Sequence, residues 1–491
     1  MAADPWITVQ LGHEANCVSS QFWNSRYLSQ NSLVDFSLFR ETCDASVVPR
    51  LVSFDWGPIG SDRKGIDPHE YSSTESGGFA WFGPLQKIRR NSSQSKKDVS
   101  QNSVCNFDPK SLIKPPSVVQ SLQYFSQGVE VYKDKLGEEF LEQIRKELES
   151  CDHLGGFQFI IDSFSGISGF ANELFYGLED EFHCKVPSIL FGCGVENSHN
   201  DYIPLKVLNE AKVLPSLLDN NIHYIPLHYG KVYHIDSTKD FWLNGASDLA
   251  ECSEHGNSCT LSAIALDCFY ALFIAPDAAS KNAALAEILK SNSHSTMSRI
   301  SLLPLVSNKN SSEKWQLRRL ITEGFRHRKS PPLYTVDLPF QKYTSEEEKT
   351  KNRNVDLAMW IVRGTQWSQT MLSDIQRNQN YSLSDIKKLL LDATGLHEES
   401  IVRTEPFGFR RIVVSSSTAN EAESTQPPFH EGCPLELIGE VSSNRVWNIR
   451  YYDMAIDHLK KFRNRKYFEE AELDDEMERI INAKENLDNL S

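Results

Sequence analysis

The hydrophobic pattern of the chain is clearest between residues 151 and 192. Phe157–Ile161 is a short apolar run, which predicts a buried strand. From Phe170 onwards, apolar residues recur every three or four positions, and this spacing predicts an amphipathic helix. Ser188–Gly192 is a second apolar run that completes a strand–helix–strand unit. We expect the rest of the chain to be organised around this unit.

The same order of strand, polar loop and helix opens the chain. Trp6–Leu11 predicts a first strand and Glu14–Tyr27 predicts the helix after it. Leu51–Asp55 predicts another strand, which ends in a carboxylate. Strands that each end at a polar or glycine-bearing loop favour an open parallel sheet, in which ligands bind outside the carboxyl ends of the strands. The sequence therefore predicts an α/β fold with a doubly wound, mostly parallel sheet.

Further elements are predicted on either side of these units. A long amphipathic helix, with apolar residues at every fourth position from Tyr132 to Leu148, leads into the central unit. Cys259–Ala275 predicts a buried core helix rather than a membrane span, because it carries Asp267 and stops at Pro276. The other candidates are strands at Ile222–Leu227, Leu302–Val306, Tyr334–Phe340, Ala358–Arg363 and Arg410–Ser416, and helices at Leu383–Ala393 and Arg445–Leu487.

The pattern also divides the chain into parts. We expect a sheet domain over residues 1–235, a central helix with a smaller mixed α/β domain over 236–440, and a C-terminal helical segment over 441–491. Residues 89–117 and 415–428 are polar and lack periodicity, and they predict exposed loops.

Composition narrows the class of protein. The chain has 66 acidic and 51 basic residues, a formal charge of −15, which argues against a general nucleic-acid binder. Its 10 cysteines form no CxxC pair, a distribution typical of reduced thiols in a cytosolic protein. The N-terminus has neither a basic region nor an apolar core, so we expect no secretory signal. Any contact with a membrane is therefore expected to be peripheral.

The loop between the central strand and its helix, Asp162–Gly169, is the first candidate site. Backbone N–H groups and the helix dipole at such a position favour an anion, so one interpretation is a phosphate-binding loop. An ordinary tight turn is the alternative. The nucleophile pattern Gly-x-Ser-x-Gly is not met at Ser165 or Ser168, so a serine hydrolase is not expected.

The sequence holds two other clusters of candidate ligands. The cysteines and histidine at 252, 255 and 259 lack a clear fourth ligand nearby, and we expect no metal site there. A basic cluster at Lys460–Lys466 suits anionic lipid or the acidic tail of a partner, or it is a solvated helix face balanced by the acids of Glu469–Glu478.

Several stretches, in their order along the chain, carry a family resemblance. Gln10–Asn24 and Pro49–Pro58 look like the first and third strand segments of tubulins. Gly128–Phe159 looks like the helix and strand that lead to the glycine-rich loop of tubulins, and Cys151–Gln158 within it is the most specific signal. The loop Ile161–Gly169, with its Phe-Ser-Gly turn, is similar to the replacement found in Misato proteins. Ser262–Pro276 and the helices from Tyr451 add weaker similarity. The chain thus resembles the Misato family of the tubulin superfamily.

The resemblance implies a tubulin-like fold and a nucleotide pocket. Its residues would be Gly12, Asn16, Ser165, Gly166, Ser168 and Gly169 around the phosphates, with Asp55 near a magnesium ion. The chain departs from the tubulin pattern at the same place. Few loop glycines remain, Glu14 adds a negative charge, and the Gly-x-x-Asn-x-Asp segment after the central helix is missing. These departures favour a degenerate pocket, with no catalytic residue and no bound metal.

Family resemblance also supplies the expected role. It implies a non-catalytic protein of mitochondrial distribution, morphology and inheritance, located in the cytoplasm and peripherally at the mitochondrial outer membrane. Such a protein would act as a scaffold for mitochondrial outer-surface or cytoskeletal partners, without a cofactor. The alternative is a GTP-binding switch or weak GTPase linked to microtubule or spindle organisation, for which GTP would be the cofactor.

Overall fold

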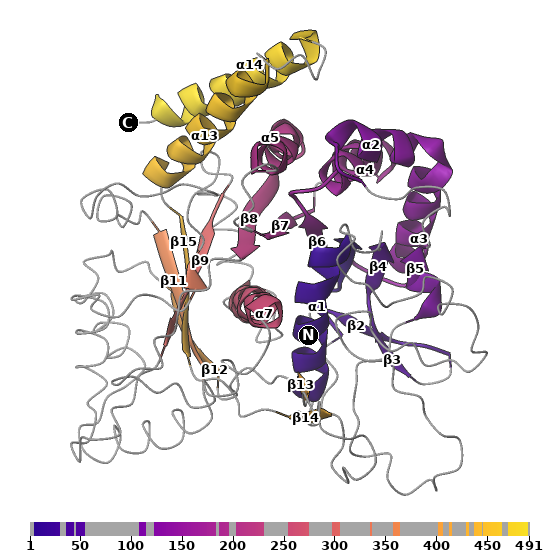
Figure 1. Cartoon of the computed structure of the whole chain (residues 1–491). Coiled ribbons are helices and arrows are strands. Elements are labelled where there is room, and N and C mark those ends of the chain that lie inside the picture. Colours follow the sequence, from indigo (N-terminus) through magenta and orange to yellow (C-terminus); the bar gives the residue numbers. More distant parts are fainter. Residues whose placement is uncertain are drawn as a thin grey trace, which may run out of the picture.

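The computed structural model describes residues 4–29, 36–43, 46–54, 108–113, 122–182, 186–195, 203–229, 254–273, 297–304, 334–335, 357–363, 401–405, 412–414, 429–431, 437–443, 445–463 and 470–489. Within these residues the fold is α/β, with two sheets and helices around and between them (Figure 1). The described elements bear out the predicted fold class.

The first sheet has six parallel strands in the order β5-β4-β1-β6-β7-β8. Their bounds are Leu112–Ile113 (β5), Leu51–Phe54 (β4), Trp6–Leu11 (β1), Gly156–Asp162 (β6), Ser188–Val195 (β7) and Ile222–Tyr229 (β8). The strands β4 and β5 are added on one side of β1, and β6, β7 and β8 are added on the other side. The strand order therefore reverses between β1 and β6, the place where open α/β sheets bind ligands.

Helices cover both faces of this sheet, as predicted. The helices α1 (His13–Ser29) and α7 (Glu254–Phe273) share one buried cluster with Ile160 of β6 and Phe191 of β7. On the other face, Phe159 packs in a second cluster with α3 (Gly137–Glu149), α4 (Ile167–Phe182) and α5 (Ile203–Asp219). Alternate residues of one strand thus serve two layers, which is why buried parallel strands read as continuous apolar runs.

A second, mixed sheet has five strands in the order β10-β9-β15-β11-β12. Their bounds are Tyr334–Thr335 (β10), Arg299–Pro304 (β9), Leu437–Ser443 (β15), Leu357–Arg363 (β11) and Ile401–Glu405 (β12). The helix α7 lies between the two sheets, because its buried residues pack with Ile300 of β9 and Val441 of β15 as well as with α1 (Figure 1). In the described part of the chain, no helix combines the length and apolar character needed to cross a bilayer.

The C-terminal helices α13 (Arg445–Arg463) and α14 (Glu470–Asp488) pack on α5 and on each other (Figure 1). Trp447 and Tyr451 of α13 are fully buried in the same cluster as α4 and α5. Ion pairs add to this contact, with Lys212 Nζ of α5 lying 3.5 Å from Glu476 Oε1 of α14. The predicted helical segment at the C-terminus is therefore confirmed for the described residues.

The prediction of one long helix before the central strand was wrong. The helix α2 (Phe125–Val131) ends in a π-helical turn at Tyr132–Leu136, and α3 follows. Within this turn the backbone of Lys135 has a positive φ of 77°. The break lets the ring of Tyr132 pack against Gly137, where a Cβ atom would lie 2.7 Å from it, and against Phe170 at 5.2 Å. The regular spacing of apolar residues in the sequence does not reveal such a break in the helix.

The predicted loop at residues 89–117 also needs correction at its C-terminal end. Leu112–Ile113 forms the edge strand β5, and Ile113 is buried under α3 and its neighbours. The elements absent from the prediction are α5, β2 (Phe39–Glu41), β3 (Val47–Pro49), β12, β14 (Phe429–Glu431) and β15. The predicted helix at 383–393 and the loop at 415–428 lie outside the described residues.

Candidate functional site

The candidate site lies at the carboxyl ends of β1 and β6, which are paired side by side through Leu11 and Ile161. The loop after each strand leads into a helix, α1 or α4. Gly12 has a φ of +97°, and a Cβ atom there would lie 2.8 Å from Asp162 Cβ. Glycine is required at this position both for the backbone conformation and for the close approach of the second loop.

The sheet brings the two predicted halves of the pocket together. Gly12 and Asn16 come from the first loop and helix, and Ser165, Gly166, Ser168 and Gly169 come from the second. Asp55, the predicted neighbour of a magnesium ion, lies outside the described residues. The two loops that the family resemblance implies in one pocket are therefore adjacent in the structure.

The N–H groups of the α4 N-terminus donate to oxygen atoms of the chain itself. The N–H of Gly166 donates to Leu122 O at 2.9 Å. The N–H groups of Ile167 and Ser168 donate to the hydroxyl and carbonyl oxygens of Ser165 at 3.3 and 3.2 Å. The N–H of Gly169 donates to Gly166 O at 3.0 Å. An anion binds a helix N-terminus through such N–H groups, so a phosphate here would have to replace existing bonds.

The two loop glycines are explained by helix packing. A Cβ atom at Gly166 would lie 2.4 Å from Tyr124 O, and one at Gly169 would lie 1.9 Å from Phe125 O. On the facing helix α2, a Cβ atom at Gly128 would lie 1.8 Å from Gly166 O. The segment at the start of α2 thus approaches the first turn of α4 too closely for any side chain. These glycines are needed for the fold whether or not a ligand binds.

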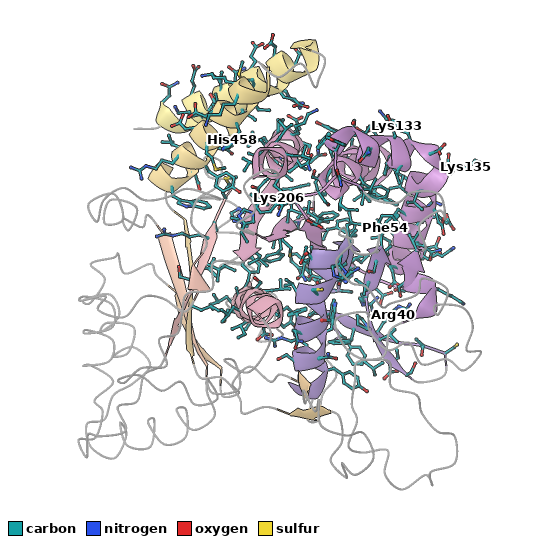
Figure 2. The ribbon with its side chains drawn as sticks, viewed as in Figure 1. Arg40, Phe54, Lys133, Lys135, Lys206 and His458 are labelled. Atoms are coloured by element: carbon teal, nitrogen blue, oxygen red, sulfur yellow. The ribbon has the colours of Figure 1, made fainter. Side chains whose placement is uncertain are left out.

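Asn16 is used inside the protein as well. Its side-chain oxygen accepts hydrogen bonds from Gln10 Nε2 and, at 3.3 Å, from Ser53 Oγ. Its amide nitrogen donates to Phe54 O at 3.5 Å, and the residue is buried. Phe54 in turn lies between β4 and the helices α3 and α4 (Figure 2). Asn16 therefore ties α1 to β1 and β4.

The electrostatic character of the site is acidic. Burial, together with the nearby charge of Glu14, raises the pKa of Asp162 to about 8, and Lys206 in the first turn of α5 acts in the opposite direction (Figure 2). The backbone N–H of Phe164 bonds to the Asp162 carboxyl group. Asp162 thus caps the loop. An anionic ligand would meet two carboxyl groups here.

Both candidate serines make local bonds. Ser165 Oγ donates to Asp162 O at 3.3 Å, and Ser168 Oγ donates to Ser165 O at 2.8 Å. Ser168 is fully buried. These are the side-chain-to-backbone bonds typical of a helix start, and they give neither hydroxyl an exposed nucleophilic position.

Sequence reasoning missed two residues beside the loop, Asn209 and Glu210 of α5. Asn209 Nδ2 donates to Gln123 O at 2.8 Å and to Phe164 O at 3.1 Å, and its Oδ1 accepts from Phe125 N–H at 3.0 Å. This one amide joins the loop to the segment in front of α2. The available signal was the helical spacing of Leu208, Ala211 and Leu214, which Pro215 interrupts.

Glu210 organises a second buried cluster. Its Oε1 accepts hydrogen bonds from Tyr224 OH and, at 2.8 Å, from His228 Nε2. The ring of Phe164, from the candidate loop, lies 4.5 Å from the His228 ring, and Tyr224 contacts Tyr451 of α13. The loop, the last strand of the sheet and the C-terminal helices therefore meet around one carboxylate.

The remaining candidates are the metal-ligating side chains and the basic cluster at Lys460–Lys466. Among the described residues, no group of three or more His, Cys, Asp or Glu side chains is arranged to hold a metal ion. Residue 252 lies outside the described residues, and the structure describes only the backbone at 255 and 259. Of the basic cluster, Lys460 and Lys461 are exposed on α13, and the residues from 464 to 466 are outside the described part.

Comparison with known proteins does not extend the resemblance. No protein-family model matches the chain, and no curated protein matches it significantly. The likeness to tubulin and Misato proteins therefore rests on the motifs quoted above.

Proposed function

We propose that the chain is a non-catalytic, tubulin-like protein that acts as a partner-binding scaffold in mitochondrial distribution, morphology and inheritance. The sequence resemblance to the Misato family supplies the biological role. The same resemblance supports a place in the cytoplasm and peripherally at the mitochondrial outer membrane, with outer-surface or cytoskeletal proteins as partners.

One observation carries the non-catalytic part of the proposal: the α4 N-terminus is closed by the chain's own oxygen atoms. Its N–H groups donate to Leu122, Ser165 and Gly166. A nucleotide would have to break these bonds, displace the segment packed on the glycines and accept Asp162 and Glu14 as neighbours. These costs favour a scaffold over a nucleotide switch.

Calorimetry with the full chain tests this part. GTP, GDP and ATP with magnesium are titrated into the protein, with tubulin as the positive control. We expect no binding heat at millimolar nucleotide, with the protein folded by circular dichroism. Micromolar binding would contradict the scaffold and favour the GTP-binding switch.

A charge variant locates any binding that is seen. Glu14 is partly exposed in the first turn of α1, so Glu14→Lys changes the charge at the site without removing a packed side chain. Phosphates bound at this site would bind more tightly in the variant. Unchanged affinity would indicate a nucleotide site elsewhere on the chain.

The cellular role has its own test. Cells depleted of the protein should show clustered or unevenly inherited mitochondria, and expression of the wild-type chain should restore their distribution. Glu14→Lys should restore it equally well if no nucleotide is needed. Normal mitochondria in fully depleted cells would contradict the role.

A further inference from the structure

Two polar side chains sit in the middle of the parallel sheet without a partner. Thr8 of β1 and Gln158 of β6 are directly paired in register, and both are fully buried. Among the described residues, neither Thr8 Oγ1 nor the nitrogen or oxygen of the Gln158 amide has a hydrogen-bond partner. A buried amide without partners costs several kcal/mol, so this pair needs an explanation.

Both side chains point to the face covered by α1. Ile7 and Val9 of β1 pack in the cluster on the opposite face, and Gln10, on the same side as Thr8, bonds to Asn16 of α1. In β6, Phe157 and Phe159 likewise belong to the opposite face. Thr8 and Gln158 therefore lie together beneath α1.

Their described neighbours within the sheet offer them no partner. Along the sheet, Thr8 is paired with Leu51 on its other side, and Gln158 is paired with Ile189. Both of these neighbours are buried apolar residues. Gln10, two residues further along β1, already accepts from Trp23 Nε1 at 3.3 Å and donates to Asn16. The pair, which we call the polar island, thus lies between apolar side chains along the sheet.

We propose that this island is a binding site for internal water, with at least one molecule bridging Thr8 Oγ1 and the Gln158 amide beneath α1. A buried water needs two to four polar partners, and these side chains offer a hydroxyl, a carbonyl oxygen and an NH₂ group. Neighbouring strands lie about 4.8 Å apart, a gap that two hydrogen bonds of about 2.8 Å span when they meet at one water.

A crystal structure of the full chain that orders internal water tests the site directly. The expected result is a density peak within hydrogen-bond distance of both Thr8 Oγ1 and the Gln158 amide. The same map of the Thr8→Val, Gln158→Met double variant should lack it. Absence of a peak in the wild type, or a Gln158 amide that bonds directly to Thr8, would overturn the proposal.

Thermal unfolding gives an independent test through the sign of the changes. If a water bridges the pair, Thr8→Val or Gln158→Met alone leaves the water and one side chain short of a partner, and each should lower the midpoint by about 3 °C. The double variant removes the whole site and should regain most of that loss. If the groups are simply unsatisfied, each single variant should instead raise the midpoint, and this result would overturn the site.

Ser20→Ala is the matched control. Ser20 is buried on α1, the helix that covers the pair, but its hydroxyl already donates to Cys17 O at 2.8 Å. Its effect on the midpoint should add to that of Thr8→Val, because the two side chains share no water. We expect the midpoint changes of Thr8→Val and Gln158→Met to be non-additive, and those of Thr8→Val and Ser20→Ala to be additive. If the midpoint changes were additive for both pairs of substitutions, this would count against a shared water.

Discussion

The two faces of the parallel sheet hold their helices by different means. On the face toward α3 and α4, aromatic rings interlock: Phe170 lies 5.0 Å from Phe140 and 5.6 Å from Phe54. On the face toward α1 and α7, buried polar groups lie among the apolar ones, and Arg26 of α1 pairs with Asp267 of α7. Around Phe170 the first face is specified by the shapes of its rings, whereas the contact between α1 and α7 also depends on hydrogen-bond partners. Substitutions on the two faces should therefore differ in how much unfolding free energy they cost and in whether a second substitution restores it.

The largest effect is expected from Phe170→Ala on the aromatic face. Phe170 is fully buried and contacts three other rings, so its removal should leave a cavity and cost about 4 kcal/mol of unfolding free energy. Denaturant unfolding followed by fluorescence measures the loss. Phe182→Ala, at the partly exposed end of the same helix, is the control and should cost much less. Equal costs would mean that the ring contacts do not decide stability here.

On the polar face we expect a smaller loss that can be recovered. Asp267→Asn removes the charge that pairs with the nearly buried Arg26, which should cost about 3 kcal/mol. Because the ion pair itself is costly to bury, the Arg26→Met, Asp267→Leu double variant should regain most of this loss. No recovery in the double variant would show that shape, rather than charge, is critical at this contact as well.

The smallest effect concerns pH. The pKa of Asp162 is about 8 in the folded protein, above the ordinary value of 3.8. A carboxyl group whose pKa is raised in this way binds its proton more tightly in the folded state. Its contribution to stability is therefore largest at low pH and is lost as the pH rises from 3.8 to about 8. Between pH 6.5 and 7.5 the loss is at most about 1.4 kcal/mol. Asp162→Asn should flatten the dependence, as measured by thermal midpoints in matched buffers. An unchanged slope would contradict the raised pKa.

The sequence was most informative where one physical rule decides the structure. Buried parallel strands are apolar on both sides, so Trp6–Leu11 and Phe157–Ile161 were predicted almost to the residue. It was least informative where the outcome depends on a neighbour. The break at Lys135 accompanies the packing of Tyr132 against Gly137 and Phe170, and α5 carries an internal proline. Both features depend on three-dimensional contacts rather than on local spacing.

The candidate site shows the same division. That Gly12 lies beside the loop after β6 was expected, from the family resemblance rather than from a predicted strand order. The closure of that loop was not, because it needs the carbonyl of Leu122 and the amide of Asn209, which come from distant parts of the chain. A glycine in a loop looks the same in the sequence whether it faces a phosphate or another helix.

The Asn209 amide has a consequence for the kinetics of local opening. It accepts a hydrogen bond from the N–H of Phe125 at 3.0 Å and donates one to the carbonyl of Phe164 at 3.1 Å. The start of α2, the loop after β6 and α5 can therefore separate only if these bonds break. Hydrogen–deuterium exchange at Phe125 and Gly166 is therefore tied to a single cooperative event. The two amides should exchange at closely matched slow rates, far below those of the exposed ends of the same helices.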